Sequence, residues 1–224
     1  MQQVVGELLP LALGIAISPI PIIAIIVILM TPKARSNGLA FLLGWMAGLL
    51  IVGGIALVVA DVAGLSTGSE AASQSQAVIK LVLGLLLLAV AARQWRSRPK
   101  PGEEASLPKW MQTLDTFTPV KSFGVAALLS GPNPKNLALN LAAMSIVATA
   151  GLSTANQVVA LLVVVVIGSL TIIAPLVVYF AGGEKSTEIL GGWKSWLSEN
   201  NAATMAVLLL VLGVALVGQG ISGL

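Results

Sequence analysis

The sequence predicts an all-α integral membrane protein with six transmembrane helices, arranged as two inverted three-helix repeats. Three observations predict this fold. Hydrophobic residues make up 57% of the chain, charged residues only 9%, and the mean hydropathy is +0.97, values typical of integral membrane proteins. Six apolar stretches are long enough to cross a bilayer, which takes about 20 residues. Two of these stretches are interrupted by a Pro-x-Pro element at matching positions.

The six predicted spans differ in length. At a rise of about 1.5 Å per residue, the first and fourth would be roughly 42 Å long as straight helices, against a hydrocarbon core of about 30 Å. Such length requires strong tilt or a break, and these two spans contain the Pro-x-Pro elements. The spans are Val4–Thr31, Gly38–Ala60, Gln76–Ala92, Ser122–Ala150, Gln157–Ala181 and Ala202–Gly220.

The two proline elements predict broken helices in the first and fourth spans. Proline has no backbone N–H and clashes with the carbonyl one turn earlier. Lipid cannot satisfy the freed carbonyl groups, so such breaks survive only inside protein or beside a wet cavity, and a matched pair of them favours a transport path between two repeats. The elements are Ser18-Pro19-Ile20-Pro21 and Gly131-Pro132-Asn133-Pro134, and the freed carbonyls would be those of Ile15, Ile17, Leu128 and Ser130.

The offset between the two proline elements also superposes Gly38 on Gly151, which favours an internal repeat. We expect one membrane domain, 1–224, made of a first repeat, 1–92, a cytoplasmic amphipathic linker, 93–121, and a second repeat, 122–224. The alternative is that two proline pairs coincide by chance in a chain without repeats.

The basic residues predict the orientation in the membrane. The loops after the first, third and fifth spans are basic, whereas the alternate loops hold almost no Lys or Arg. The positive-inside rule places the basic loops in the cytoplasm and both termini outside. Three spans per repeat is an odd number, so the second repeat is inverted relative to the first. The basic residues are Lys33, Arg35, Arg93, Arg96, Arg98, Lys100, Lys109, Lys121, Lys185 and Lys194.

Two further segments carry structural expectations. In the linker, the pattern of Leu107–Phe117 predicts a short helix lying on the membrane surface. In the second span, Gly44 and Gly48 permit close helix approach. We expect these glycines to pack against another helix of the same chain, and a homodimer interface is the alternative.

Lys135 is the most unusual residue of the chain, because it lies roughly midway along the fourth span with no acidic residue at comparable depth. A charge at the middle of the membrane costs at least about 2.5 kcal/mol on insertion scales, and such residues usually have a function. Three roles stay open: pairing with an anionic substrate, carrying a proton, or capping the freed carbonyls of a half-helix C-terminus.

Polar side chains around the breaks extend the candidate transport path. Binding of a substrate head group and satisfaction of the broken backbone are both compatible with them. Asp61 is a candidate for a proton or ion relay at the outer mouth, with an ordinary exposed carboxylate at a helix end as the alternative. Together with Lys135, the path residues are Ser18, Pro19, Pro21, Ser130, Pro132, Asn133, Pro134, Asn136 and Asn140.

Several function classes are excluded or disfavoured. The chain contains no cysteine and no histidine, which removes thiol redox chemistry and the usual metal ligands. No nucleotide-binding motif occurs, and a net charge of +3 does not suggest nucleic-acid binding. One buried lysine without an acid or a histidine offers little for general acid–base catalysis, so we expect neither an enzyme nor a cofactor.

The residues around both breaks resemble the GAP/Sap family of glycolipid- and sulfolipid-addressing proteins, within the LysE transporter superfamily. The resemblance covers nearly the whole chain and is most specific at the Asn-Pro-Lys-Asn element. It implies a six-span protein of the bacterial inner membrane that helps deliver envelope lipids outward. The matching runs are Ala16–Ala24, Pro32–Arg35, Gly38–Trp45, Pro108–Met111, Leu114-Asp115, Pro119, Leu129-Ser130 and Asn133–Asn136.

Three functions follow as hypotheses. The first is an exporter or flippase for a polar-headed, anionic lipid, bound between the two broken helices and driven by the proton gradient. The second keeps that site for a small soluble metabolite such as an amino acid. The third is a non-transporting membrane protein that assists envelope-lipid synthesis or transport machinery.

Overall fold

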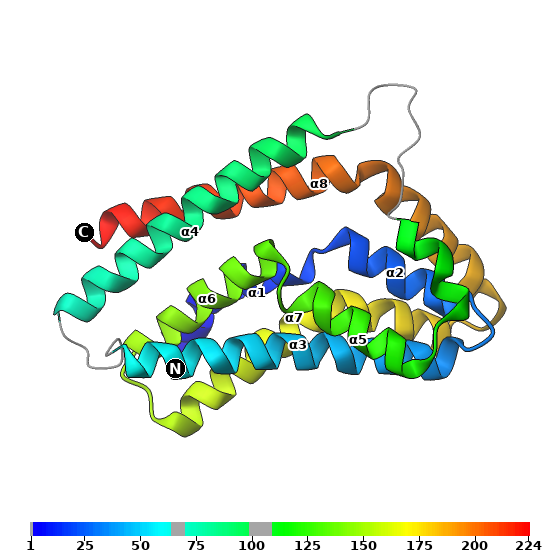
Figure 1. Ribbon diagram of the computed structural model, residues 1–224, viewed down its shortest axis with the longest axis horizontal. Helices are drawn as coiled ribbons and strands as arrows, with labels where there is room; N and C mark the ends of the chain where they lie inside the picture. Colours follow the sequence, from blue (N-terminus) through cyan, green and yellow to red (C-terminus); the bar gives the residue numbers. More distant parts are fainter. Residues whose placement is uncertain (1, 64–69, 99–108) are drawn as a thin grey trace.

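The computed structural model describes residues 2–63, 70–98 and 109–224, and within these ranges every regular element is a helix. Figure 1 shows them lying roughly side by side along one long axis. In chain order they are α1 (Gln2–Ala16), α2 (Pro19–Leu29), α3 (Ala34–Val62), α4 (Glu70–Arg96), the 3₁₀ helix η2 (Lys109–Thr116), α5 (Pro119–Ser130), α6 (Pro134–Thr149), α7 (Thr154–Ala181), the 3₁₀ helix η3 (Gly183–Lys185) and α8 (Ser186–Ser222).

Within the described residues, four helical segments are long and apolar enough to cross a membrane, namely Ala34–Val62, Gln74–Arg96, Thr154–Ala181 and Gly183–Ser222. The pair α1 and α2 also passes as one span, bent by 56° at its break. The chain is therefore an all-helical protein with the helices of a membrane-embedded fold. Six spans and an inverted repeat stay predictions.

Three of the four prolines, Pro19, Pro21 and Pro134, lie in the first turn of a helix, whereas Pro132 lies between α5 and α6. The helix α1 ends at Ala16 and α2 begins at Pro19, with Ser18 as its N-cap residue. The helix α5 ends at Ser130 and α6 begins at Pro134, with Asn133 as its N-cap. The first turn of a helix is where proline fits best, because the missing N–H has no partner there in any helix.

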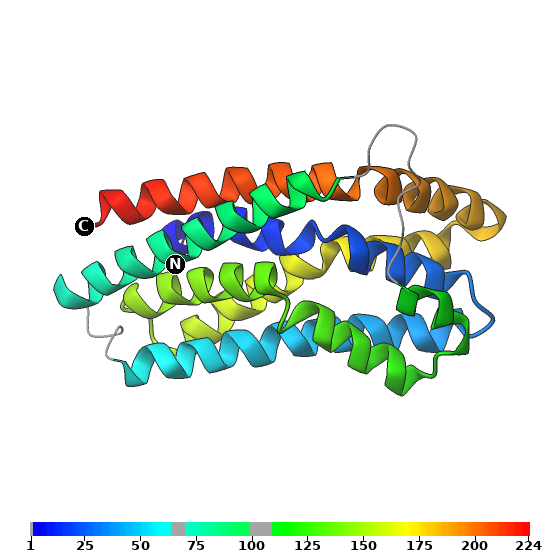
Figure 2. The ribbon, with the colours of Figure 1, turned by 45° about the horizontal axis from the view of Figure 1, so that its top comes forward.

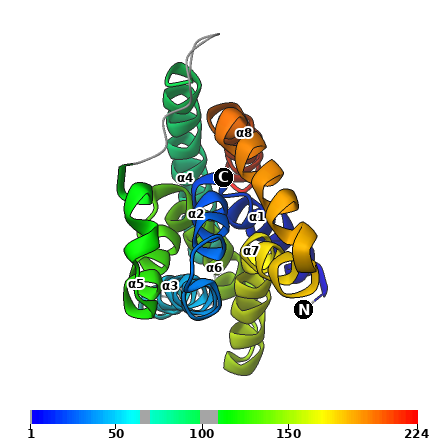
Figure 3. The ribbon, with the colours of Figure 1, turned by 90° about the vertical axis from the view of Figure 1, so that its right-hand side faces the viewer.

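The α-helices other than α7 fall into three groups (Figures 1 and 3), and α7 packs against α1 and α3. The helices α4 and α8 run side by side along one flank, and α3 lies against α5 on the opposite flank. Between the flanks lie α1, α2 and α6, which Figure 2 shows from a second direction. Nine of the 11 residues of α2 are buried, as expected for a helix that is apolar on every side.

The small residues of α3 explain its close contact with α5. A Cβ atom at Gly44 would overlap the backbone of Phe123, and one at Gly48 would overlap the hydroxyl of Ser130. The Gly44–Gly48 stripe therefore packs within the chain, as we expected.

The end of the linker forms a short helix, as predicted for Leu107–Phe117. It is the 3₁₀ helix η2, Lys109–Thr116, which packs against α2, and its place at the membrane surface stays a prediction. Met111, Leu114 and Phe117 are buried. Their spacing of three matches three residues per turn, so one apolar side forms and contacts the protein. Residues 99–108 of the predicted linker lie outside the described residues.

The segment between the last two predicted spans was expected to be a loop, and the structure differs from this prediction. It is helical from Ser186 onward, so α8 includes Lys194 and begins well before Ala202. The chain reverses within a few residues, at Gly183, whose φ of +54° suits glycine. The segment after it contains no proline to end a helix.

Candidate functional site

The α1–α2 break lies inside the protein, and each of its backbone carbonyls has a donor. The Leu13 carbonyl accepts from the Ile17 amide at 3.0 Å, and the Ser18 carbonyl accepts from the Ile22 amide at 3.1 Å. Neither bond reaches the four carbonyls between them. Those four accept from side chains, which is the solution required where no water or lipid can pair with a carbonyl.

Lys135 supplies most of these bonds from the start of α6. Its ammonium nitrogen Nζ donates to the carbonyls of Gly14 at 2.6 Å and Ile17 at 2.9 Å, and to Ser18 Oγ at 2.7 Å. The Ile15 carbonyl lies 3.3 Å away. An ammonium has three protons, so the three short bonds use all of them.

Two hydroxyl groups complete the pairing. Ser18 Oγ donates to the Ile15 carbonyl at 2.8 Å while it accepts from Lys135. Thr171 of α7 donates from Oγ1 to the Ala16 carbonyl. The break is thus held from both neighbours, α6 and α7. Of the three roles left open for Lys135, the geometry directly supports capping of the half-helix C-terminus.

The α5–α6 break is held mainly by its own residues. The side-chain oxygen of Asn133 accepts from the Lys135 amide at 3.1 Å, which caps α6. Asn136 Nδ2 donates to the Leu129 carbonyl at 3.4 Å, and Ser130 Oγ to the Ala127 carbonyl at 3.2 Å. Asn140 instead reaches α3, where its Nδ2 donates to the Leu49 carbonyl at 3.2 Å. The side-chain amides of Asn136 and Asn140 thus connect α6 to α5 and to α3.

Residues from both proline elements and from the start of α6 line one cavity of about 470 Å³. The first element contributes Ser18, Pro19, Ile20 and Pro21. The second contributes Asn133 and Pro134, and Lys135 follows directly after it. The helices α4 and α8 provide the remaining wall, with Val90, Arg93, Gln94, Ser97, Asn201, Met205 and Leu209.

The other predicted path residues lie elsewhere. Ser130, Asn136 and Asn140 are buried between helices, and exposed Pro132 does not line this cavity. Asp61 is an exposed residue in the last turn of α3 and also lies outside the cavity.

A model of the family described as Sap, sulfolipid-1-addressing protein, matches residues 8–222. The chain belongs to the Sap family. No curated protein and no solved structure matches it. The matched region includes both proline elements and all residues that line the cavity. The GAP/Sap resemblance of the sequence is confirmed, and membership of the LysE superfamily stays a prediction.

Sequence reasoning missed half of the cavity wall of this Sap-family protein. The residues Val90, Arg93, Gln94 and Ser97 follow the spacing i, i+3, i+4, i+7, which places them on one face of α4. The polar residues of this face, at the end of an otherwise apolar helix, were the sequence signal that could have predicted the cavity wall. Asn201 had no such signal, because asparagines such as Asn200 and Asn201 are common in a polar segment.

Half of the residues that line this cavity of the Sap-family protein are polar or charged, and we call it the polar cavity. Two of them are cationic, Arg93 and Lys135, and no carboxylate lines the cavity among the residues that the structure describes. Asn201 Oδ1 is buried, and among the described residues it has no hydrogen-bond partner. The cavity therefore offers an arginine whose planar group suits oxyanions, with a second cation, Lys135, behind it.

Proposed function

We propose that this Sap-family protein is a secondary transporter, an exporter or flippase, that moves a polar-headed anionic lipid across the bacterial inner membrane. The cavity between the two broken helices is the head-group site. The observation that carries the proposal is its lining, which combines two cations and five uncharged polar residues with no carboxylate in the described part of the chain. The family description, which names sulfolipid addressing, agrees with this chemistry.

Arg93 is the residue that contacts the anionic group. The protons of Lys135 are directed at the α1–α2 break, so this ammonium acts on the cavity through its field. Arg93 is exposed at the end of α4 and lines the cavity. Its guanidinium pairs with sulfate, phosphate or carboxylate in bidentate fashion.

A second cavity favours a lipid over a small soluble metabolite. It measures about 460 Å³, is almost wholly apolar, and is lined by Leu88, Ala91, Ala92, Trp95, Ala206, Val207 and Leu210. On α4 these residues are offset by two positions from those of the polar cavity, a rotation of roughly 200°. The two cavities thus lie on opposite faces of the α4–α8 pair. A lipid tail fits the apolar face while its head occupies the polar one.

Alternating access between two inverted repeats is the proposed mechanism. Helix contacts that support the repeat occur in matching pairs: α3 packs on α5 as α7 packs on α1, and α4 packs on α6 as α8 packs on α2. In Figure 1, α1 and α2 run toward one end of the bundle, and α5 and α6 run toward the other. Such repeats rock against each other around a central site. We propose that the proton gradient drives the cycle.

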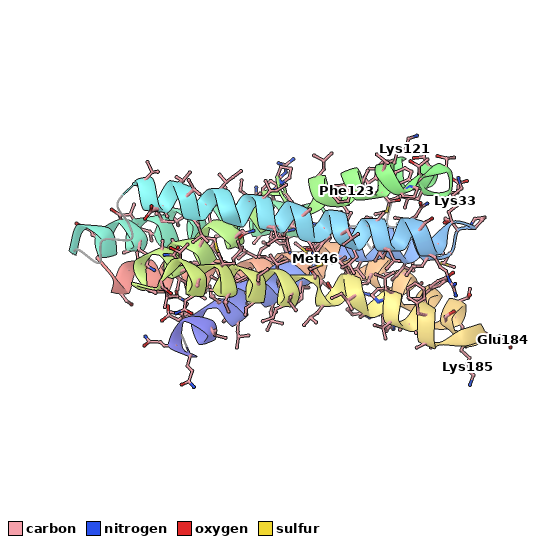
Figure 4. All side chains as sticks on the ribbon, turned by 90° about the horizontal axis from the view of Figure 1, so that it is seen from below. Lys33, Met46, Lys121, Phe123, Glu184 and Lys185 are labelled. Atoms are coloured by element: carbon pink, nitrogen blue, oxygen red, sulfur yellow. The ribbon has the colours of Figure 1, made fainter. Side chains whose placement is uncertain are left out.

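The orientation is part of the proposal. Lys33, Lys121 and Lys185 lie at the same end of the bundle in Figure 4, although they belong to three distant segments of the chain: the N-cap of α3, the first turn of α5, and η3. This clustering supports a cytoplasmic location for that end.

Transport by protein in liposomes tests the proposal. Labelled anionic lipids, zwitterionic lipids and amino acids are offered to native protein and to Arg93→Gln. We expect native protein to move the anionic lipid. We expect Arg93→Gln to slow it about tenfold or more, because a hydrogen bond to a charged group contributes about 1.5–3 kcal/mol.

Arg96→Gln is the matched control, since Arg96 lies in the same last turn of α4 but does not line the cavity. Equal loss in both variants would contradict the role of Arg93. Transport of amino acids alone would favour the metabolite exporter, and no transport of any compound by native protein would favour the accessory role.

The apolar cavity gives a second test. Ala92 is exposed and lines this cavity, so Ala92→Trp fills it without disturbing the core. We expect lipid transport to fall severalfold while movement of any small solute is unchanged. Ala203→Trp, an exposed position of α8 outside both cavities, is the control and should transport lipid normally.

A further inference from the structure

The oxygen atoms around the Lys135 ammonium form a compact set. Three backbone carbonyls and one hydroxyl, all from Gly14–Ser18, lie 2.6–3.3 Å from Nζ. None of them carries a formal charge. They line the C-terminal end of α1, where the helix dipole places partial negative charge. Lys135 and Ser18 are 4% exposed.

Such a set is the chemistry of a monovalent-cation site. Hard cations take oxygen ligands, and unwound carbonyls at a half-helix C-terminus coordinate Na⁺ or H⁺ in membrane transporters. Four neutral oxygens without a carboxylate suit a single positive charge, because nothing in the set would balance a second one.

We propose that the α1–α2 break is a monovalent-cation site that the chain occupies with its own ammonium group, Lys135 Nζ. The cation is tethered to α6, so this site needs no ion from solution. Removing the lysine side chain while leaving space behind would open the site to a free cation. Because Lys135 also lines the polar cavity, an ion reaches the vacated position from there.

The size of the site sets an order of preference. Donor–acceptor distances of 2.6–2.9 Å for three of the oxygens suit ammonium and K⁺, which are close in size. Methylammonium also restores part of the missing side chain. We therefore expect methylammonium to bind the vacated site best, then ammonium and K⁺, then Na⁺.

Thermal unfolding of Lys135→Ala in detergent tests this inference. The protein is compared in choline, sodium, potassium, ammonium and methylammonium chloride at one ionic strength. In choline we expect a midpoint well below that of native protein, because the carbonyls of Gly14 and Ile17 lose their donor. In methylammonium, ammonium or potassium we expect a saturable rise of several degrees, since a ligand that binds only the folded state stabilises it.

Three variants make the test specific. Lys135→Met fills the space with an apolar chain and should show no cation response. Lys80→Ala removes another buried lysine, from α4, and should not respond either. Adding Ser18→Ala to Lys135→Ala removes one oxygen and should raise the half-saturating methylammonium concentration severalfold.

Equal midpoints for Lys135→Ala in all five salts would overturn the inference, as would the same cation response in native protein or in Lys80→Ala. If Lys135→Ala unfolds in choline, it is purified in each salt instead. Folded protein in methylammonium but not in choline supports the site, and failure in every salt counts against it. These results depend on stability alone, so they are independent of the proposed transport.

Discussion

Thr171 is a residue whose importance depends on one backbone carbonyl. It lies on α7 and donates to the carbonyl of Ala16 at the end of α1. A carbonyl inside the membrane that loses its donor costs the full desolvation of the group. The hydroxyl of Thr171 therefore matters more than its small size suggests, as does that of Ser18, which both donates and accepts at the same break.

Thr171→Val keeps the shape of the side chain and removes only the donor. We expect it to lower the free energy of unfolding by about 1–3 kcal/mol, measured by unfolding in detergent. Ser169→Ala is the control. Ser169 donates to the Val165 carbonyl one turn back in the same helix, and that carbonyl keeps its helical bond. Equal losses in the two variants would refute the special role of the Ala16 carbonyl.

At the scale of elements, close contact between α3 and α5 positions the second break. The two helices approach until only glycine fits at Gly44 and Gly48. This contact places Ser130, the last residue of α5, beside the middle of α3. The start of α6 and its lysine follow directly from there, so packing on one flank determines where Lys135 points.

Gly44→Ala tests this packing. Its Cβ would overlap the backbone of Phe123, which cannot move aside as a flexible side chain would. We expect a loss of about 1–3 kcal/mol in the free energy of unfolding, typical of overpacking. Gly54→Ala lies on the same helix with no atom within 4 Å of the added Cβ and should change stability little. A neutral Gly44→Ala would show that the helices can separate without cost.

At the scale of the whole molecule, the orientation in the membrane decides which face of the cavity is filled first. The basic loops lie together at one end of the bundle, and the turn between α6 and α7 belongs to the other. Since the chain has no cysteine of its own, any introduced cysteine reports its side of the membrane without interference.

Ser153→Cys and Glu184→Cys test the orientation. Both positions are exposed and lie in turns between helices. In intact cells stripped of their outer envelope, a thiol reagent that cannot cross membranes should label Cys at position 153 and not at position 184. In inside-out vesicles the labelling should reverse. The opposite result in both preparations would invert the predicted topology.

Local sequence patterns were enough to predict the helix-rich fold and to single out Lys135, because a lysine deep in an apolar stretch is rare in any membrane protein. They could not choose among its roles. The partners of its ammonium lie about 120 residues earlier in the chain. Most of them are backbone carbonyls, which every residue has, so the sequence does not identify them.

Tertiary packing explains what local patterns missed. Arg93 and Asn201 share a cavity only because α4 lies alongside α8, a pairing between distant segments. Asn140 bonds to α3 and does not line the cavity, and its place on a transport path stays a prediction. The start of α8 at Ser186 was not predicted, because hydropathy alone does not detect a polar helical segment.

The bonds between Lys135 and the α1–α2 break have a consequence for biosynthesis. Chains are made from the N-terminus, so α1 and α2 enter the membrane well before the ribosome adds Lys135 and Thr171. Until then the carbonyls of Gly14, Ala16 and Ile17 have none of their final donors. We therefore expect the first half of the chain to stay near the insertion machinery, where water or helper proteins can pair with those groups, until α6 and α7 arrive.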